Sequence, residues 1–300
     1  MRVGELKSRL EDDPLAANLN PQAALDDVIY VPARRYGQWA FIAFMLVVLG
    51  TVGWAVVSNP RMSWDVVGHY LFHPAILDGL VLTCWLTVVT TFLGLVIGIV
   101  LAIMRLSSNM FISGMSGVYV WFFRGTPLLV QLIILYNLAS LFPTLSISIP
   151  FGPTLLSANT NTLITPYVAA ILGLCLHEAA YMAEIVRGGL LSFDKGQRHA
   201  ADALGMTGWQ KFMHVVLPQV MPSIIPPIGN QLIGMLKMTS LVSVIALSDL
   251  LYSVQLIYSR NYQTIPLLLV ACFWYLVATT VLSGAQRLVE RRFGKGIAVR

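Results

Sequence analysis

Long apolar runs with few charges alternate with short polar connections along most of the chain. Six of these runs approach or exceed the roughly 20 residues that an α-helix needs to cross a hydrocarbon core of about 30 Å. They are Trp39–Val57, Ile76–Met104, Gly117–Leu141, Tyr167–Val186, Ile224–Ser248 and Ile265–Leu282. The pattern predicts an all-α, polytopic membrane protein with about six transmembrane helices.

Composition agrees with this fold class. Of 300 residues, 57% are hydrophobic and only 11% are charged, whereas a soluble domain typically has about 25% charged residues. A net charge of +5 could indicate binding to nucleic acid. In membrane proteins, however, Lys and Arg collect in the cytoplasmic loops, so no nucleic-acid partner is expected. The three cysteines, Cys84, Cys175 and Cys272, lie inside apolar runs, and neither a disulfide framework nor a metal site is expected.

Lys and Arg are distributed unequally between the connections, which predicts the orientation of the chain. One side receives Arg34, Arg35, Arg105, Arg187, Lys195, Arg198, Lys211, Arg287, Arg291, Arg292 and Lys295. The other side receives only Arg61 and Arg260. Both termini are therefore expected in the cytoplasm, with residues 1–37 as a polar tail and 291–300 as a basic tail. The tail at the start has no apolar core, so a cleavable signal peptide is not expected.

Two connections are long enough to present a surface. On the side poor in Lys and Arg, Phe142–Pro166 is rich in Ser, Thr, Asn and Pro. This composition is compatible with a lid, a docking surface or a plain solvated loop. On the opposite side, His177–Pro218 leads from an apolar run into a mixture of Gly, Ala, His and charge.

The segment His177–Pro218 predicts two short helices. A helical pattern from His199 is expected to end at Gly205. Thr207 can cap a second helix over Gly208–Val216, which Pro218 is expected to stop. Such a pair fits a groove on another protein, and an interfacial amphipathic hairpin without a partner is the alternative.

Charges inside the predicted spans point to a second candidate site. Lys237 lies roughly 13 residues into its span, about 20 Å along the axis. It is expected to face protein or a water-filled cavity. It either lines a translocation path, where it would attract a carboxylate, or forms an internal ion pair with Glu178 or Asp249. The internal ion pair is favoured. Neighbouring hydrogen-bonding residues complete the candidate translocation path: Asn230, Gln231, Thr239 and Ser240. Glu184 and Arg187, three residues apart, are expected to form a local ion pair.

Several motifs in a fixed order carry a family resemblance. His199-Ala200-Ala201, Gly205 and Val215-Val216-Leu217-Pro218 match the spacing of the "EAA" loop of binding-protein-dependent ABC importer permeases. The chain is similar to the polar amino-acid subfamily in EAAYMAEIVRGGL, in Gly196-Gln197, in FRGTPLLVQL from Phe123 to Leu132, and in LKMTSL from Leu236 to Leu241. The resemblance covers about residues 76–290, and the order of the motifs makes it specific.

The resemblance implies a fold and a mechanism. Residues 76–290 would form the five-helix permease core, with 38–58 as an additional transmembrane helix. A coupling loop at about 187–220 would sit in a cleft of a cytoplasmic ATPase dimer, through contacts of His199, Ala200, Ala201, Leu204, Gly205, Leu217 and Pro218. His199 departs from the family's usual Glu, which would remove one charge pair with the ATPase.

Further implications concern partners. A second permease subunit, identical or paralogous, and an extracytoplasmic substrate-binding protein are expected at a bacterial cytoplasmic (inner) membrane. The substrate would be a polar amino acid, an opine or a related compound. No Gly-x4-Gly-Lys-Ser/Thr motif occurs in the chain, so ATP and Mg are expected on the ATPase, with no cofactor and no catalytic or metal-binding residue here.

Two other classes of protein are weighed against the permease. A self-sufficient secondary transporter or channel would use Lys237, Glu178 and Asp249 as a proton relay, but gives no reason for the EAA-like loop. A membrane-bound hydrolase has no Ser/His/Asp constellation on one membrane face to support it.

Overall fold

The computed structural model describes residues 36–148 and 154–293. The expected tails at 1–37 and 291–300 therefore lie almost wholly outside the described residues. The chain divides into two units, residues 1–61 and 62–300, and each is described by itself.

In the first unit, α3 (Tyr36–Val57) is a single apolar helix, as the run Trp39–Val57 predicts. It is long enough to cross a membrane, and none of its residues is buried. A short 3-10 turn, η2 (Pro60–Met62), follows at the boundary between the units. An uncharged helix of this length fits the additional transmembrane helix expected at 38–58.

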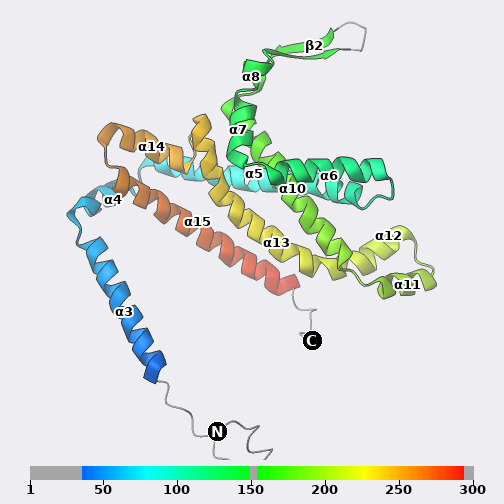
Figure 1. Ribbon diagram of the computed structural model, residues 1–300, viewed down its shortest axis with the longest axis horizontal. Helices are drawn as coiled ribbons and strands as arrows, with labels where there is room; N and C mark the ends of the chain where they lie inside the picture. Colours follow the sequence, from blue (N-terminus) through cyan, green and yellow to red (C-terminus); the bar gives the residue numbers. More distant parts are fainter. Residues whose placement is uncertain (1–35, 149–153, 294–300) are drawn as a thin grey trace, which may run out of the picture. The chain divides into compact units, whose positions relative to one another are not determined.

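The second unit is a bundle of long helices (Figure 1). Its described helices that are long and apolar enough to span are α5 (Pro74–Arg105), α10 (Pro166–Leu191), α13 (Leu217–Met238) and α15 (Thr264–Phe293), where α13 passes directly into η4 (Thr239–Ile245). With α3 this makes five spans among the described residues, or six if a bent pair described below counts as one. The polytopic helical fold is therefore confirmed.

The most extensive packing between helices joins α5 to α10, and small residues make their close approach possible. A Cβ built on Gly98 would lie 2.6 Å from the Cβ of Met182, and one on Gly94 would lie 2.8 Å from the Cβ of Glu178. Ala179 and Ala183 of α10 are buried in the same interface. Small residues spaced by four let two helices approach closely where lipid gives no hydrophobic drive.

The segment expected to form one span, Gly117–Leu141, is not a single straight helix. The chain instead forms α6 (Met110–Gly125) and α7 (Leu128–Tyr136), bent by 100°. Pro127 has no N–H to donate and forces Thr126 into an extended conformation, so the helix cannot continue. The Gln131 side chain donates to the carbonyls of Phe123 and Thr126, both at 3.1 Å, and so satisfies backbone groups that the break frees.

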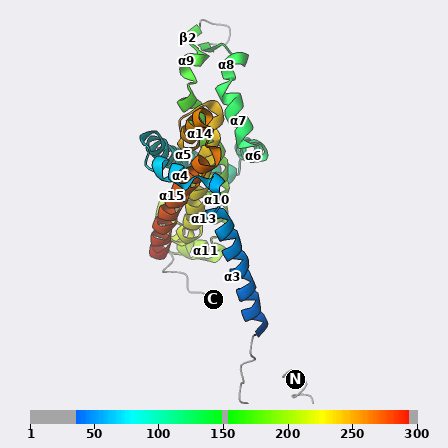
Figure 2. The same cartoon turned by 90° about the vertical axis from the view of Figure 1, so that its left-hand side faces the viewer.

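The connection Phe142–Pro166 contains structure of its own. After α8 (Leu138–Leu141), strands β1 (Thr144–Ser148) and β2 (Thr154–Asn159) pair antiparallel, and α9 (Thr160–Leu163) follows. Alternating apolar and hydroxyl side chains in β1 explain the extended structure. Figure 2 shows this hairpin extending away from the packed helices of the second unit.

Two further helices complete the outer connections: α4 (Trp64–Tyr70) and α14 (Leu250–Asn261). The sequence did not predict α14, which begins where the Asp249 carboxylate accepts the Tyr252 N–H at 2.9 Å. Both helices pack around α15, and Trp274 of α15 donates its indole N–H to the Leu71 carbonyl at 2.7 Å.

Candidate functional site

The α11–α12 segment, residues 195–216, lies beyond the ends of α10 and α13 (Figure 1). It consists of α11 (Lys195–Ala203), α12 (Gly208–Lys211) and a π-helical turn, η3 (Phe212–Val216). A helix is present around His199–Gly205, as expected, and Gly208–Val216 is helical but is not a separate short helix. The ends of α11 and α12 explain why the segment folds as it does.

The end of α11 is fixed by Gly205. Its φ of +70° lies in the left-handed region that favours glycine. The N–H of Gly205 donates to Asp202 O at 3.0 Å and that of Met206 to Ala201 O at 3.2 Å, the two bonds of a Schellman ending. The backbone therefore reverses sharply between α11 and α12.

The starts of both helices are capped by side chains. Asp194 accepts the Gly196 N–H at 2.6 Å at the start of α11. At the start of α12, Thr207 and Gln210 form a reciprocal capping box. Lys211 of α12 also donates to Asp202 of α11, an ion pair that lowers the pKa of the Asp202 carboxyl. Local interactions alone give the segment a defined shape.

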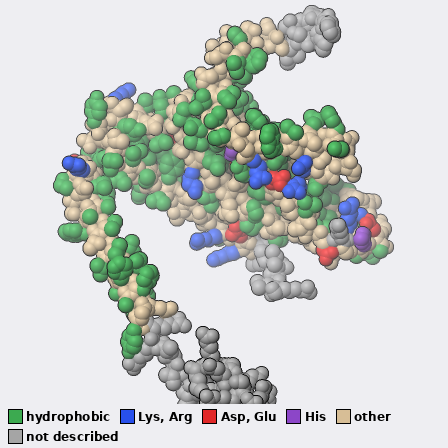
Figure 3. Space-filling model, in the orientation of Figure 1, with side chains coloured by type: hydrophobic (Ala, Val, Ile, Leu, Met, Phe, Trp, Pro, Cys, Tyr) green, Lys and Arg blue, Asp and Glu red, His purple; other side chains and the backbone are tan. Residues whose placement is uncertain are grey.

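Its outer surface carries apolar side chains that the second unit does not cover. Leu204 is 81% exposed and Trp209 is 67% exposed. His199, Ala200 and Gly205 are exposed beside them, whereas Ala201 is buried. Figure 3 shows acidic, basic and histidine side chains gathered over this part of the molecule, so the apolar tip has a charged rim.

Pro218 does not end the second helix, and that prediction is wrong. The N–H of Leu217 donates to Phe212 O, five residues back, and α13 starts at once with Pro218 in its first turn. A wide π turn changes the hydrogen-bonding register and leaves room for a proline ring. Leu217 is half-buried and Pro218 is exposed. The second short helix is therefore continuous with a transmembrane helix.

The two helices that flank the segment are also joined at their base. A Cβ on Gly189 of α10 would lie 2.2 Å from Ile224 Cγ1 of α13, so the helices are in close contact there. Ser192 and Ser223 bring their hydroxyls to 3.5 Å at the same level. The helices α10 and α13 therefore meet directly at the base of the α11–α12 segment.

The predicted internal ion pair of Lys237 is wrong for the described residues. The ion pairs present there are Glu184–Arg187, as expected and 2.7 Å long, and Asp202–Lys211. Glu178, fully buried, accepts instead from Gln231 Nε2 at 3.3 Å, and Asp249 accepts from Tyr275. Lys237 is exposed on the single subunit.

The polar residues around Lys237 divide between two faces of the chain. Asn230 is exposed, one heptad before Lys237 and so on the same helical face. Gln231 points the other way, toward Glu178. Thr239 is buried and donates to Leu236 O at 2.7 Å, and Ser240 donates to Lys237 O at 2.7 Å.

The sequence did not predict two contacts. The first lies beside Lys237, and the second joins α6 to α10. Gln286 of α15 donates to Asn230 Oδ1 at 3.1 Å and so fixes the amide beside Lys237. Arg124, at the end of α6, lies 5.1 Å from the ring centroid of Tyr181 on α10. The FRGTP motif was the available signal for Arg124, while nothing in the sequence relates Gln286 to Asn230.

Glu178 and Asp249 are too far apart for a proton relay. Gly94 of α5 contacts Glu178, and Gly79 of the same helix contacts the Asp249 backbone. Fifteen residues of helix separate these glycines, about 22 Å along the axis. Among the described residues, no three His, Cys, Asp or Glu side chains form a group that would hold a metal ion.

The fold and this surface define a class: a multi-helix membrane protein that exposes a partly apolar segment beyond the ends of its long helices. Comparison with known proteins makes the class specific. The family described as "Binding-protein-dependent transport system inner membrane component" matches residues 94–295. The chain belongs to this family.

Two permeases with similar sequences match this chain over most of their own length. The chain is 40% identical to the arginine transport system permease protein ArgU of Corynebacterium glutamicum, over 88% of this chain and 83% of ArgU. It is 32% identical to the glutamine transport system permease protein GlnP of Escherichia coli, over 77% of this chain and 98% of GlnP. A solved amino acid ABC transporter, crystallised with histidines, matches 76% of this chain and 98% of its own with 34% identity and a TM-score of 0.63.

The molecule is therefore the multi-pass transmembrane permease subunit of an ABC importer in the cytoplasmic membrane. As a family member it works with an ATPase and a substrate-binding protein. The reading as a self-sufficient secondary transporter or channel is set aside, since family membership and the separation of Glu178 from Asp249 both oppose it.

Proposed function

We propose that the α11–α12 segment couples this permease to a separate cytoplasmic ATPase, and that the complex imports polar amino acids or related compounds. One observation carries the coupling assignment. The segment has a locally fixed shape, an exposed apolar tip at Leu204, and a base at which α10 and α13 are in close contact.

The contact surface follows from exposure. His199, Ala200, Leu204 and Gly205 face outward, so they would meet the ATPase directly. The remaining coupling residues, Ala201, Leu217 and Pro218, would act mainly through shape, because Ala201 packs inside the segment and Leu217 and Pro218 join it to α13. An exposed Leu between small residues suits a groove on a partner.

His199 changes the electrostatics of that contact. A histidine replaces the carboxylate usual in the family, while Asp202 three residues later is already engaged by Lys211. The tip therefore offers the ATPase less negative charge than the family pattern does. Either the ATPase differs at the matching position or that charge pair is dispensable.

The ATPase would supply all the chemistry of the cycle. ATP with Mg would bind and be hydrolysed there, and closure of the ATPase dimer would move the α11–α12 segment. Since α10 and α13 are joined at Gly189 and Ile224, both helices would move with it and switch the permease between inward-open and outward-open states.

The substrate class rests on the relatives. Proteins named for arginine and glutamine transport share 32–40% identity with this chain, and a polar amino acid carries a carboxylate that a cation can attract. Lys237, exposed and without an ion pair in the described chain, is the residue we assign to that role, with Asn230 beside it and Ser240, Gln231 and Thr239 shaping the helix around it.

A second permease subunit would complete the path. Lys237 and Asn230 are exposed on one subunit in a region expected to lie within the bilayer, where a charge facing lipid is costly. A facing subunit, either a copy of this chain or a paralogue, would enclose them, and the extracytoplasmic binding protein would deliver the solute.

Co-purification with the cognate ATPase tests the coupling assignment. Deletion of Ala200–Gly205 should abolish it, and Leu204→Asp should weaken it because a charge replaces the apolar tip. Leu204→Met is the matched control and should retain the complex. Intact ATPase binding after the deletion would rule out this segment as the coupling site.

A further inference from the structure

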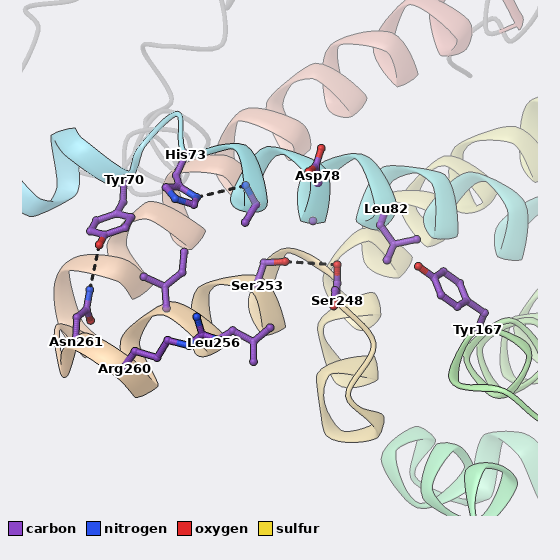
Figure 4. A pocket seen from close by; sticks show the side chains of 13 residues that line it. Tyr70, His73, Asp78, Leu82, Tyr167, Ser248, Ser253, Leu256, Arg260 and Asn261 are labelled. Carbon is purple, nitrogen blue, oxygen red and sulfur yellow. Dashed lines mark hydrogen bonds between the residues drawn. The ribbon is translucent and has the colours of Figure 1, made fainter.

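A cavity of about 620 Å³ lies at the end of the second unit where α14 meets the starts of α5 and α10 (Figure 4). This is the side expected to face away from the cytoplasm, since Arg260 belongs to it. The volume is within the range of about 300–1,000 Å³ typical of small-molecule sites. Its polar lining comes from positions as distant in the sequence as His73, Tyr167 and Arg260.

Arg260 supplies the charge of this cavity. It is exposed and forms no ion pair within the described residues. Figure 4 shows its side chain lying along α14 beside Leu256. A guanidinium offers five N–H donors in a planar fork and no acceptor, which suits carboxylate or phosphate oxygens.

Two neutral donors accompany Arg260. The Nδ1 atom of His73 accepts the Ala75 N–H at 3.3 Å, so the proton of the neutral ring is on Nε2, which is left as a donor. In Figure 4 the Tyr167 hydroxyl points from α10 toward Leu82, and no hydrogen bond engages it within the described chain.

The other polar side chains of the cavity are already engaged or turned aside. Ser253 donates to Ser248 O at 3.5 Å, and the Asn261 amide donates to the Tyr70 hydroxyl at 3.5 Å. Asp78 points away from Arg260 and His73 in Figure 4. The lining therefore combines the Arg260 cation and neutral donors with the carboxylate of Asp78, next to an apolar wall of Leu82, Leu256 and Ile257.

We propose that this cavity is an outer binding site for the transported solute, in which Arg260 binds the carboxylate and His73 Nε2 donates to it. The apolar wall contacts the aliphatic part of the molecule. The inference rests on the proposed function, because it takes the solute to be an amino acid, and it adds a site separate from Lys237.

The test measures solute binding to the permease–ATPase complex in nanodiscs of phosphatidylcholine, without the binding protein. The probes are radiolabelled L-arginine, L-glutamine and L-cystine, with their decarboxylated amines agmatine, 4-aminobutanamide and cystamine as competitors. For the amino acid that binds wild type, Arg260→Gln should weaken the site by about tenfold or more. The matching amine should not compete, because it lacks the carboxylate.

Matched variants separate this site from general effects of charge and folding. Arg61→Gln removes the other cation of the same expected side, does not line the cavity and should leave binding unchanged. His73→Asn keeps an acceptor for the Ala75 N–H and loses the Nε2 donor, so binding should fall by less than in Arg260→Gln. Lys237→Met should leave the Arg260-dependent component in place.

Two results would overturn the proposal. The first is equal amino-acid binding by wild type and Arg260→Gln in complexes that retain the ATPase. The second uses nanodiscs in which phosphatidylglycerol makes up one fifth of the lipid. If Arg260→Gln loses bound phosphatidylglycerol while its amino-acid binding is unchanged, the cavity holds a lipid phosphate and not the solute. Failure of the proposed function looks different, because wild type with its ATPase and binding protein would then import none of the amino acids.

Discussion

The α11–α12 segment and the Lys237 face of α13 would perform the two parts of one transport cycle, yet they are built differently. The segment gets its shape from neighbours in sequence: the Asp194 cap, the Gly205 reversal and the Thr207–Gln210 capping box. The Lys237 face depends on distant residues, such as Gln286, and its cation has no ion pair among the residues that the structure describes. A docking surface can be rigid by itself, whereas a path needs its partner to be complete.

Replacing Gly205 should have the broadest effect, because ATPase binding and uptake both depend on the docking surface. Gly205→Val places a β-branched residue at φ +70°, where a left-handed conformation costs about 1–2 kcal/mol and more for a branched side chain. ATP-dependent uptake in proteoliposomes should fall by about tenfold or more, together with ATPase binding. Gly205→Asn, which tolerates this conformation better, should retain more of both. Equal uptake by the two variants would show that the reversal is unimportant.

Removing the charge of Lys237 should separate the two regions. A hydrogen bond to a charged group contributes about 1.5–3 kcal/mol, so Lys237→Met should reduce uptake by about 10- to 100-fold. Co-purification with the ATPase should be unchanged, because Lys237 is outside the α11–α12 segment. Uptake with the affinity and rate of wild type would remove Lys237 from the path.

The packing beneath both regions can be tested at Gly98. A Cβ there would meet Met182 Cβ at 2.6 Å and Ala183 N at 2.9 Å, so Gly98→Ala should destabilise the permease by about 1–3 kcal/mol. Gly114 of α6 has open space around it, and Gly114→Ala should be neutral or slightly stabilising. Thermal unfolding of both variants in detergent measures the difference. A similar melting temperature for both would contradict the close contact of α5 and α10.

The smallest effect is expected for the ion pair between the two short helices. Lys211 lowers the pKa of Asp202 below its usual value. A carboxyl with a lowered folded-state pKa contributes stability above its unfolded pKa, near 4, and loses it as pH falls through the folded value. Hydrogen exchange over residues 195–211 should therefore differ slightly between wild type and Asp202→Asn at pH 6, and no longer differ near pH 2.5. An equal difference at both pH values would contradict this role.

The sequence predicts the α11–α12 segment better than the Lys237 face, because the first depends on local contacts and the second on distant ones. Gly205 and Thr207 act on their own neighbours, so the end of α11 and the start of α12 were predictable, and so was the Glu184–Arg187 pair at one helical turn. The partner of Glu178 was not predictable, because Gln231 and Glu178 come from different helices and meet only after α10 and α13 pack.

Prolines show the limits of local rules. At Pro127 the chain bends by 100° between α6 and α7, and the missing N–H of proline explains the break. The prediction from the sequence had placed Pro127 inside one span. Pro218 was expected to stop a helix and does not, because a π turn precedes it. The cavity around Arg260 was beyond prediction altogether, since its donors are at positions 73, 167 and 260.

A photo-crosslinking experiment tests the central claim most directly. A p-benzoylphenylalanine placed at Leu204, 81% exposed, is compared with one at Leu141, 69% exposed and next to the hairpin on the side expected to face outward. The account predicts a crosslink from position 204 to the ATPase and none from position 141. A crosslink to the ATPase from position 141, or none from 204 in a complex that still hydrolyses ATP, would contradict it.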